Sequence, residues 1–211
     1  MTGGIVLTEV GPRDGLQNEK VVVDKAAKIA FIDRLSDAGF AEIEVTSFVS
    51  PKWVPQLADA AEVLAGIRRR PGTLYSALVP NEQGLERALA AKVDKVSVFT
   101  AASESFCRRN INASIAESIE RFRPVVVRAK AAGLPVRGYV SCAVACPFEG
   151  PVDPRAVAET SKRLLDCGVD ELDLGDTIGV AVPLDVERLL EAHDPLVRRD
   201  ALVLHLHDTR G

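Results

Sequence analysis

Two of the three histidines in this 211-residue chain, His205 and His207, stand two positions apart. Alternate side chains of a β-strand point to the same face, so on a strand both imidazoles would face one side. Two neutral imidazoles on one side can bind a divalent cation, and one added carboxylate would leave open positions for a substrate oxygen. The alternative interpretation is a pair of ordinary strand-end histidines.

Three charged residues near the start could complete such a site. Asp14 could supply the carboxylate, and its neighbour Arg13 could stabilise the negative charge of an enolate oxygen or form a surface ion pair. Glu44 stands among apolar residues of an expected strand. A carboxylate inside a barrel is costly unless it is paired, so Glu44 is either hydrogen-bonded to a cation or exposed outside the barrel.

The remaining polar residues of interest also lie on or just after expected strands. They are Ser47, Ser103, Glu104, Asp173, Asp176 and Asp208. In barrel enzymes the active site is built at the carboxyl ends of the strands, so this shared placement favours one common site.

Apolar runs and helical spacing alternate along the whole chain. We expect strands over residues 5–10, 42–46, 74–79, 95–100, 136–141, 171–174 and 202–206. We expect helices over residues 24–38, 55–66, 82–91, 114–132, 153–168 and 183–192. Pro124 should kink or split the fourth of these helices.

Seven strands alternating with helices predict a parallel sheet and favour a (β/α)8 TIM barrel over a doubly wound sheet. Here the barrel would be incomplete, a single domain over residues 1–211 without its last helix-strand-helix portion. In a closed barrel the first and seventh strands both flank the eighth, so Asp14, His205 and His207 could converge. We expect low stability of the chain alone, because its first and seventh strands would be open edges.

Composition sets broad limits on partners and compartment. The net charge is −4, and charged residues make up 27% of the chain, so we expect no nucleic-acid partner. The apolar runs are too short to span a bilayer, and residues 1–4 leave no room for a leader, so we expect a cytoplasmic protein without a membrane partner. The four cysteines are too few and too scattered for a disulfide framework, which predicts buried or loop thiols.

Several blocks of this sequence, in order, resemble the hydroxymethylglutaryl-CoA lyase family of the DRE-TIM metallolyases. The blocks are residues 11–19 (GPRDGLQNE), 44–56 (EVTSFVSPKWVPQ), 101–104 (AASE), 110–112 (NIN), 137–142 (RGYVSC), 174–179 (LGDTIG) and 205–209 (HLHDT). The Gly-Pro before Arg13 and the Leu-Gln-Asn-Glu after Gly15 favour the lyases over the related isopropylmalate and homocitrate synthases.

The resemblance implies a function for each candidate residue. Asp14, His205 and His207 would bind Mg2+ or Mn2+, and Arg13 would stabilise the enolate of the departing acetyl-CoA. Glu44 and Asp176 would support catalysis by proton transfer or by holding Arg13 and the metal shell. Ser47 and Ser103 would contact the substrate.

The implied reaction cleaves 3-hydroxy-3-methylglutaryl-CoA to acetoacetate and acetyl-CoA, a step of leucine degradation. The partner would be an acyl-CoA thioester, and a homodimer is an oligomeric state to test. The alternatives are a lyase for a longer branched 3-hydroxyglutaryl-CoA, a condensing synthase, and a metal- or CoA-binding fragment inactive without further chain.

The sequence departs from the family pattern at a few positions. The catalytic cysteine and an asparagine ligand of the family would lie beyond Gly211, and none of the four cysteines here matches that loop. Asp173 stands where the family pattern has a serine, and Arg210 stands where it has an aromatic residue. An extra carboxylate at Asp173 could alter the substrate pocket or the pKa of its neighbours.

Overall fold

The computed structural model describes residues 4–209, so Arg210 and most of the N-terminal tetrapeptide considered above lie outside the described residues. The chain divides between Ser97 and Val98 into two compact units.

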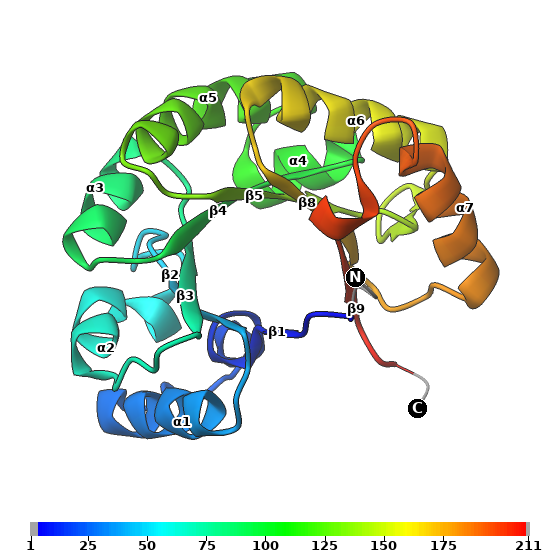
Figure 1. The fold of residues 1–211 in the computed structure, drawn as a ribbon. Coiled ribbons are helices and arrows are strands. Elements are labelled where there is room, and N and C mark those ends of the chain that lie inside the picture. The colour runs from blue at the N-terminus through cyan, green and yellow to red at the C-terminus, as the bar shows by residue number, and fades with distance from the viewer. Residues whose placement is uncertain (1–3, 210–211) are drawn as a thin grey trace. The chain divides into compact units, whose positions relative to one another are not determined.

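The first unit alternates short parallel strands with helices, whose colours run from blue through cyan to green in Figure 1. Its elements are β1 (Thr8–Glu9), the π-helical turn η1 (Gly11–Gly15), α1 (Lys25–Asp37), β2 (Glu42–Ser47), the 3-10 turn η2 (Pro55–Leu57), α2 (Ala60–Gly66), β3 (Leu74–Leu78), α3 (Glu82–Ala90) and the start of β4 (Lys95–Ala101). The strands pair in the order β1-β2-β3-β4, and each pair is parallel.

Burial and capping explain the central elements of this unit. Every residue of β2 is buried, as expected for a parallel strand that is covered on both faces. The Asp24 side chain accepts hydrogen bonds from the amides of Ala26 and Ala27 and so begins α1 at the predicted residue. Asn81 begins α3 in the same way, by accepting from the Gly84 amide.

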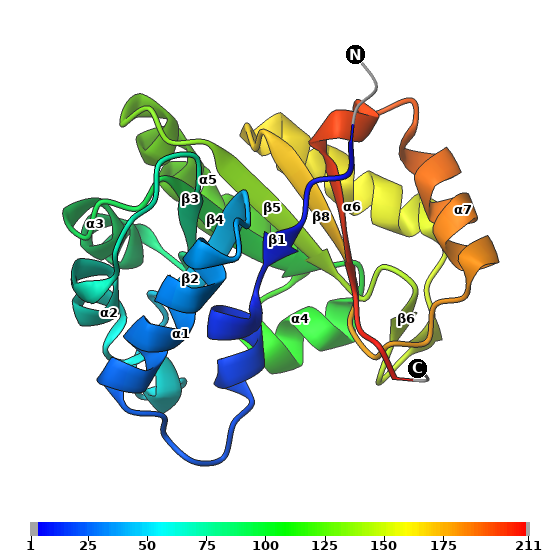
Figure 2. The ribbon, with the colours of Figure 1, turned by 60° about the horizontal axis from the view of Figure 1, so that its bottom comes forward.

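The second unit continues the alternation, and Figure 2 shows β8 and β9 side by side within it. Its elements are the end of β4, α4 (Glu104–Ile111), α5 (Ile115–Ala131), β5 (Val136–Ser141), β6 (Ala145–Cys146), β7 (Gly150–Pro151), α6 (Pro154–Cys167), β8 (Glu171–Asp176), α7 (Pro183–His193), the 3-10 turn η3 (Arg199–Ala201) and β9 (Leu202–Leu206). β5, β8 and β9 pair in parallel, whereas β6 and β7 form a separate antiparallel pair.

The two longest helices of this unit begin and end within one residue of the predicted ranges. Ser114 and Glu117 form a capping box at the start of α5. Asp153 caps α6, and Gly168 ends it in the left-handed region at φ 106°. The expected break at Pro124 does not occur as a split, because α5 runs through Pro124 as one helix.

Some predicted boundaries were wrong. The first strand is shorter than predicted, because Thr8 and Glu9 pair with β2 whereas residues 5–7 are exposed and unpaired with it. The predicted helix over residues 55–66 is a 3-10 turn followed by the seven-residue α2. Sequence analysis also missed α4 and the β6-β7 pair, because both are too short to carry a recognisable period.

The strand order confirms the predicted fold class. The larger sheet has seven strands in the order β1-β2-β3-β4-β5-β8-β9. Each strand of this sheet therefore lies beside the preceding one, and a helical crossover connects the two. This is the topology of a (β/α)8 barrel, here with seven of its strands. Within residues 4–209, no helix combines the length and apolar character required to cross a membrane.

Candidate active site

The π-helical turn after β1 carries the predicted site residues Arg13 and Asp14. Its sequence is Gly11-Pro12-Arg13-Asp14-Gly15, and π-helical turns of this kind occur frequently at functional sites. Arg13 is buried, and its Nε donates a 2.5 Å hydrogen bond to Glu44 Oε2 while its NH1 donates a 2.7 Å bond to Asp14 Oδ1. One guanidinium therefore joins the two carboxylates that the sequence singled out.

Burial decides between the alternatives left open for Glu44 and Arg13. Glu44 has no exposed surface and pairs with Arg13, so it is the carboxylate hydrogen-bonded to a cation rather than one exposed outside the barrel. The side chain of Arg13 is 8% exposed, so this is not a surface ion pair. Two desolvated charges at this distance fix the plane of the guanidinium strongly.

An irregularity in β2 accompanies Glu44. The pairing with β3 runs Glu44↔Ser76 and then Thr46↔Ala77, so Val45 is an extra residue on β2. A bulge of this kind bends a strand and re-aims its side chains, and bulges are over-represented beside active sites.

The second unit carries the two histidines, at and just after the end of β9. Their ring centroids are 4.9 Å apart, as expected for side chains on one face of a strand. His207 Nδ1 lies 3.0 Å from the carbonyl oxygen of Asp176 and 3.1 Å from that of Thr177. Carbonyl oxygens only accept, so in the neutral imidazole the proton is on Nδ1 and the lone pair on Nε2 is available for a ligand.

Hydrogen bonds within and to the loop after β8 hold these two carbonyls in position. The Asp176 carboxylate is buried and accepts hydrogen bonds from the amides of Val180 at 3.2 Å and Ala181 at 2.9 Å. The Thr209 hydroxyl donates to the carbonyl of Gly179 at 2.5 Å. Asp176 therefore holds the loop that orients His207.

Tyr139 on β5 is a candidate site residue, because its ring contacts that of His205, and the sequence analysis did not select it. It is 6% exposed, and its ring meets that of His205 edge-on at a centroid distance of 6.2 Å. Tyr139 lies within residues 137–142, one of the sequence blocks that resemble the lyase family, and this position was the only sequence feature that pointed to it.

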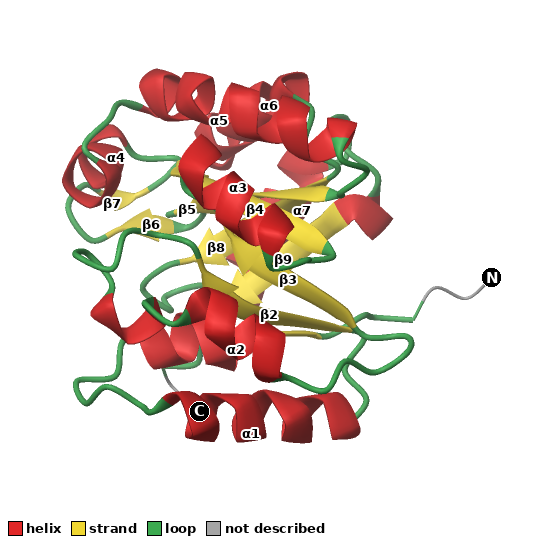
Figure 3. Ribbon diagram, turned by 90° about the vertical axis from the view of Figure 1, so that its left-hand side faces the viewer, coloured by secondary structure: helices red, strands yellow, loops and turns green. Residues whose placement is uncertain are grey.

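The two predicted substrate serines lie in different units. Ser47 is buried at the end of β2, and its hydroxyl accepts from the Val49 amide at 3.1 Å. Ser103 caps α4 by accepting from the Phe106 amide at 3.1 Å, and it donates to Cys146 Sγ at 3.0 Å. Figure 3 shows α4 and the β6-β7 pair at the same end of the second unit.

The four cysteines are free and buried, as the sequence predicted. Burial raises the pKa of Cys107 and Cys167, and it raises the pKa of Cys142 to about 12. Burial also opposes ionisation of Cys146, but hydrogen bonds from Ser103 and from backbone amides outweigh it and lower its pKa. Thiols that resist ionisation are poor nucleophiles, which agrees with assigning no catalytic role to Cys107, Cys142 or Cys167.

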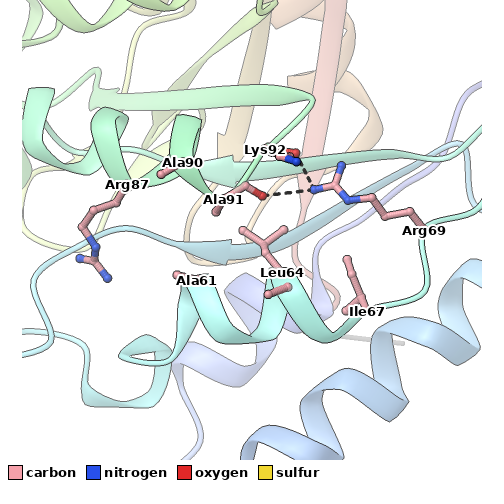
Figure 4. A pocket seen from close by; sticks show the side chains of 9 residues that line it. Ala61, Leu64, Ile67, Arg69, Arg87, Ala90, Ala91 and Lys92 are labelled. Carbon is pink, nitrogen blue, oxygen red and sulfur yellow. Dashed lines mark hydrogen bonds between the residues drawn. The ribbon is translucent and has the colours of Figure 1, made fainter.

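A pocket on the first unit lies apart from these residues (Figure 4). It is lined by Ala61, Leu64, Ala65, Ile67, Arg69, Arg87, Ala90, Ala91 and Lys92, which come from α2, α3 and the segments that follow them. Arg69 donates to the carbonyls of Ala91 and Lys92 across it. The lining includes none of the predicted site residues.

The fold is an incomplete (β/α)8 barrel, and charged and histidine side chains follow the carboxyl ends of its strands. The chain belongs to the HMGL-like family, which it matches over residues 4–211. Enzymes of this family are in general metal-dependent. Two imidazoles and a carboxylate are a donor set that suits a divalent cation.

Individual relatives agree with this membership. The chain is 53% identical to the cytoplasmic 3-hydroxy-3-methylglutaryl-CoA lyase of Rattus norvegicus over 98% of its own length and 60% of that protein. It is 55% identical to the 3-hydroxy-3-isohexenylglutaryl-CoA/hydroxy-methylglutaryl-CoA lyase of Pseudomonas aeruginosa, over 97% of its own length and 68% of that protein. The chain thus spans about three fifths of the length of the rat relative.

Solved structures give the same result. The HMG-CoA lyase of Brucella melitensis superposes with a TM-score of 0.95 at 55% identity, over 97% of this chain and 72% of that one. An HMG-CoA lyase of Acinetobacter baumannii, solved in complex with coenzyme A and 3-methylmalate, superposes with a TM-score of 0.93 at 37% identity, over 98% and 67% of the two chains.

Proposed function

We propose that this chain forms the larger part of a carbon-carbon lyase that cleaves 3-hydroxy-3-methylglutaryl-CoA to acetoacetate and acetyl-CoA. The observation that carries the proposal is Arg13, a buried guanidinium held between Glu44 and Asp14 in the turn after the first strand. Such a group suits the oxygen of a thioester enolate, where negative charge develops when the carbon-carbon bond breaks.

We assign the metal ligands to Asp14, His205 and His207, each of which offers one ligand atom. Asp14 and His205 are half-buried and His207 is exposed, which leaves room for a substrate to approach. Mg2+ or Mn2+ is the proposed cation; when bound, it would supply positive charge to the hydroxyl and carbonyl oxygens of the substrate.

The remaining residues would orient these groups. Glu44 holds the guanidinium of Arg13, and Asp176 holds the loop that orients His207, so we favour a positioning role over proton transfer for both. Ser47 and Ser103 would contact the substrate. Ser103 would then exchange its hydrogen bond to Cys146 for one to the substrate.

A CoA thioester is the proposed substrate class, supported by the coenzyme A in the A. baumannii relative. We also propose a homodimer and a cytoplasmic location, both expected from the sequence. The P. aeruginosa relative is named for both an isohexenyl and a methyl substrate, which favours a longer branched 3-hydroxyglutaryl-CoA as the second candidate.

The test is acetoacetate release from 3-hydroxy-3-methylglutaryl-CoA with Mg2+ or Mn2+. We expect activity that EDTA abolishes and that Asp14→Asn reduces by about 100-fold or more. The control is the same substitution at an exposed aspartate, Asp166→Asn, which should keep the wild-type rate. Activity with the isohexenyl analogue alone would favour the second candidate. Folded protein that cleaves neither thioester, both as this chain and when extended through a family-like eighth strand and cysteine loop, would contradict the lyase proposal and favour a metal- or CoA-binding role.

A further inference from the structure

Asp173 on β8 is a buried carboxylate that the mechanism above does not use. It is 2% exposed, and it stands in the middle of a strand whose neighbouring residues, Leu172 and Leu174, are fully or almost fully buried. A carboxylate is rarely kept at such a position unless a cation or hydrogen-bond donors compensate its charge.

The strand register places Asp173 on the face that carries the histidines. Asp173 is level with Tyr139 on β5 and with Val203 on β9, so these three side chains share one face of the sheet. Val203, His205 and His207 alternate along one stretch of chain, so the imidazole of His205 lies on this face too, one step nearer the carboxyl end.

Gly175 leaves space between the two groups. It pairs directly with His205 and has no side chain, so β8 places no side chain between Asp173 and His205 on this face. Side chains on strands lean along the strand direction, and diagonal neighbours on adjacent strands are within reach of an aromatic ring. The edge-on ring of Tyr139 limits rotation of His205 on the β5 side.

We propose that Asp173 is a positioning residue for the cation site: in the cation-loaded protein its carboxylate accepts a hydrogen bond from the ring nitrogen of His205 that faces away from the cation. A metal-bound histidine commonly donates its other N–H to a carboxylate or carbonyl, which fixes its tautomer and makes it a better ligand. His207 already uses two backbone carbonyls in this way, and Asp173 would give His205 the equivalent partner.

This inference rests on the proposed cation site and not on the identity of the substrate. Mn2+ binding is therefore measured directly, by electron paramagnetic resonance of the free ion, without any thioester. We expect Asp173→Asn and Asp173→Ser to weaken Mn2+ binding about 10- to 100-fold, whereas Asp166→Asn on the outer surface of α6 leaves it unchanged. His205→Ala serves as the reference for loss of a direct ligand.

A second readout separates positioning from a general loss of structure. In 15N-edited proton spectra of the Mg2+-loaded protein, the ring N–H of His205 that faces away from the cation should be shifted downfield and protected from exchange in the wild type but not in Asp173→Asn, while that of His207 is unchanged. Wild-type Mn2+ affinity with an unchanged His205 N–H resonance in folded Asp173→Asn would overturn the inference and leave the lyase proposal standing. Absence of Mn2+ binding by the wild type would overturn both the inference and the cation site.

Discussion

At the scale of single residues, the site depends on pairing charges that burial would otherwise make costly. Arg13 shows this most clearly, because its two donors reach two carboxylates from one planar group. Glu44 is fully buried, and a buried carboxylate is costly unless it is paired, as it is here with that guanidinium. The charge at Arg13 is therefore held in a fixed orientation before any substrate arrives.

Replacing Arg13 with lysine tests this geometry. A lysine ammonium is a point charge and cannot reproduce the two fixed donors, so we expect Arg13→Lys to lower kcat by about 100-fold. Steady-state assays of acetoacetate release measure the change, with the exposed Arg155→Lys as control. A wild-type kcat in Arg13→Lys would show that any positive charge suffices at this position.

At the scale of elements, the loop between β8 and α7 shapes the histidine ligands. Gly179 lies in this loop in the left-handed region at φ 64°. A Cβ there would stand 2.8 Å from the carbonyl oxygen of His207 and 2.3 Å from Cγ2 of Thr209. The loop can approach the segment after β9 so closely only because residue 179 has no side chain.

Gly179→Ala should therefore displace the loop. We expect it to destabilise the protein by about 1 to 3 kcal/mol, because the new methyl group meets backbone and the backbone conformation is strained for alanine. Urea unfolding measures the loss, and Mn2+ affinity should fall with it because His207 loses its carbonyl partners. Gly133→Ala, at φ 78° with open space around its Cβ position, is the matched control: it shares the strain without the contact, so a loss as large as that of Gly179→Ala would contradict this account.

At the scale of the whole molecule, stability depends on groups far from the site. His193 at the end of α7 is fully buried, with Nε2 2.9 Å from the Ser161 hydroxyl and Nδ1 2.7 Å from the Leu189 carbonyl. Burial lowers the pKa of His193 below its ordinary value, against a smaller opposing effect of the Leu189 carbonyl. The imidazole is therefore kept neutral in the folded protein.

This linkage makes the free energy of unfolding depend on pH. Because the folded pKa is the lower one, the unfolded state binds the proton first, so the contribution of His193 is complete above about pH 6.5 and is lost as the pH falls below that value. Urea unfolding between pH 5 and 8 should show a steeper loss below pH 6.5 in the wild type than in His193→Gln. Parallel curves for the two proteins would refute the assignment.

Local chemistry in the sequence determined the elements and the choice of site residues. Asp24, Ser114 and Asp153 begin helices through their own side chains, and apolar runs gave the paired strands, so the barrel topology followed from local pattern. Residue types and family blocks selected Arg13, Asp14, His205 and His207. The same local signals could not predict the shortness of β1 or the continuity of α5 through Pro124, because neighbouring chain segments decide both.

Only the tertiary structure decided which partners the selected residues have. Arg13 and Glu44 are 31 positions apart, and no local pattern predicts a 2.5 Å bond between them. The tautomer of His207 depends on carbonyls some 30 positions earlier, and the place of Asp173 beside Tyr139 depends on strand register. Contacts between distant segments depend on packing, whereas caps and periods depend on neighbouring residues, and this is why the sequence predicted elements and candidates but not their pairing.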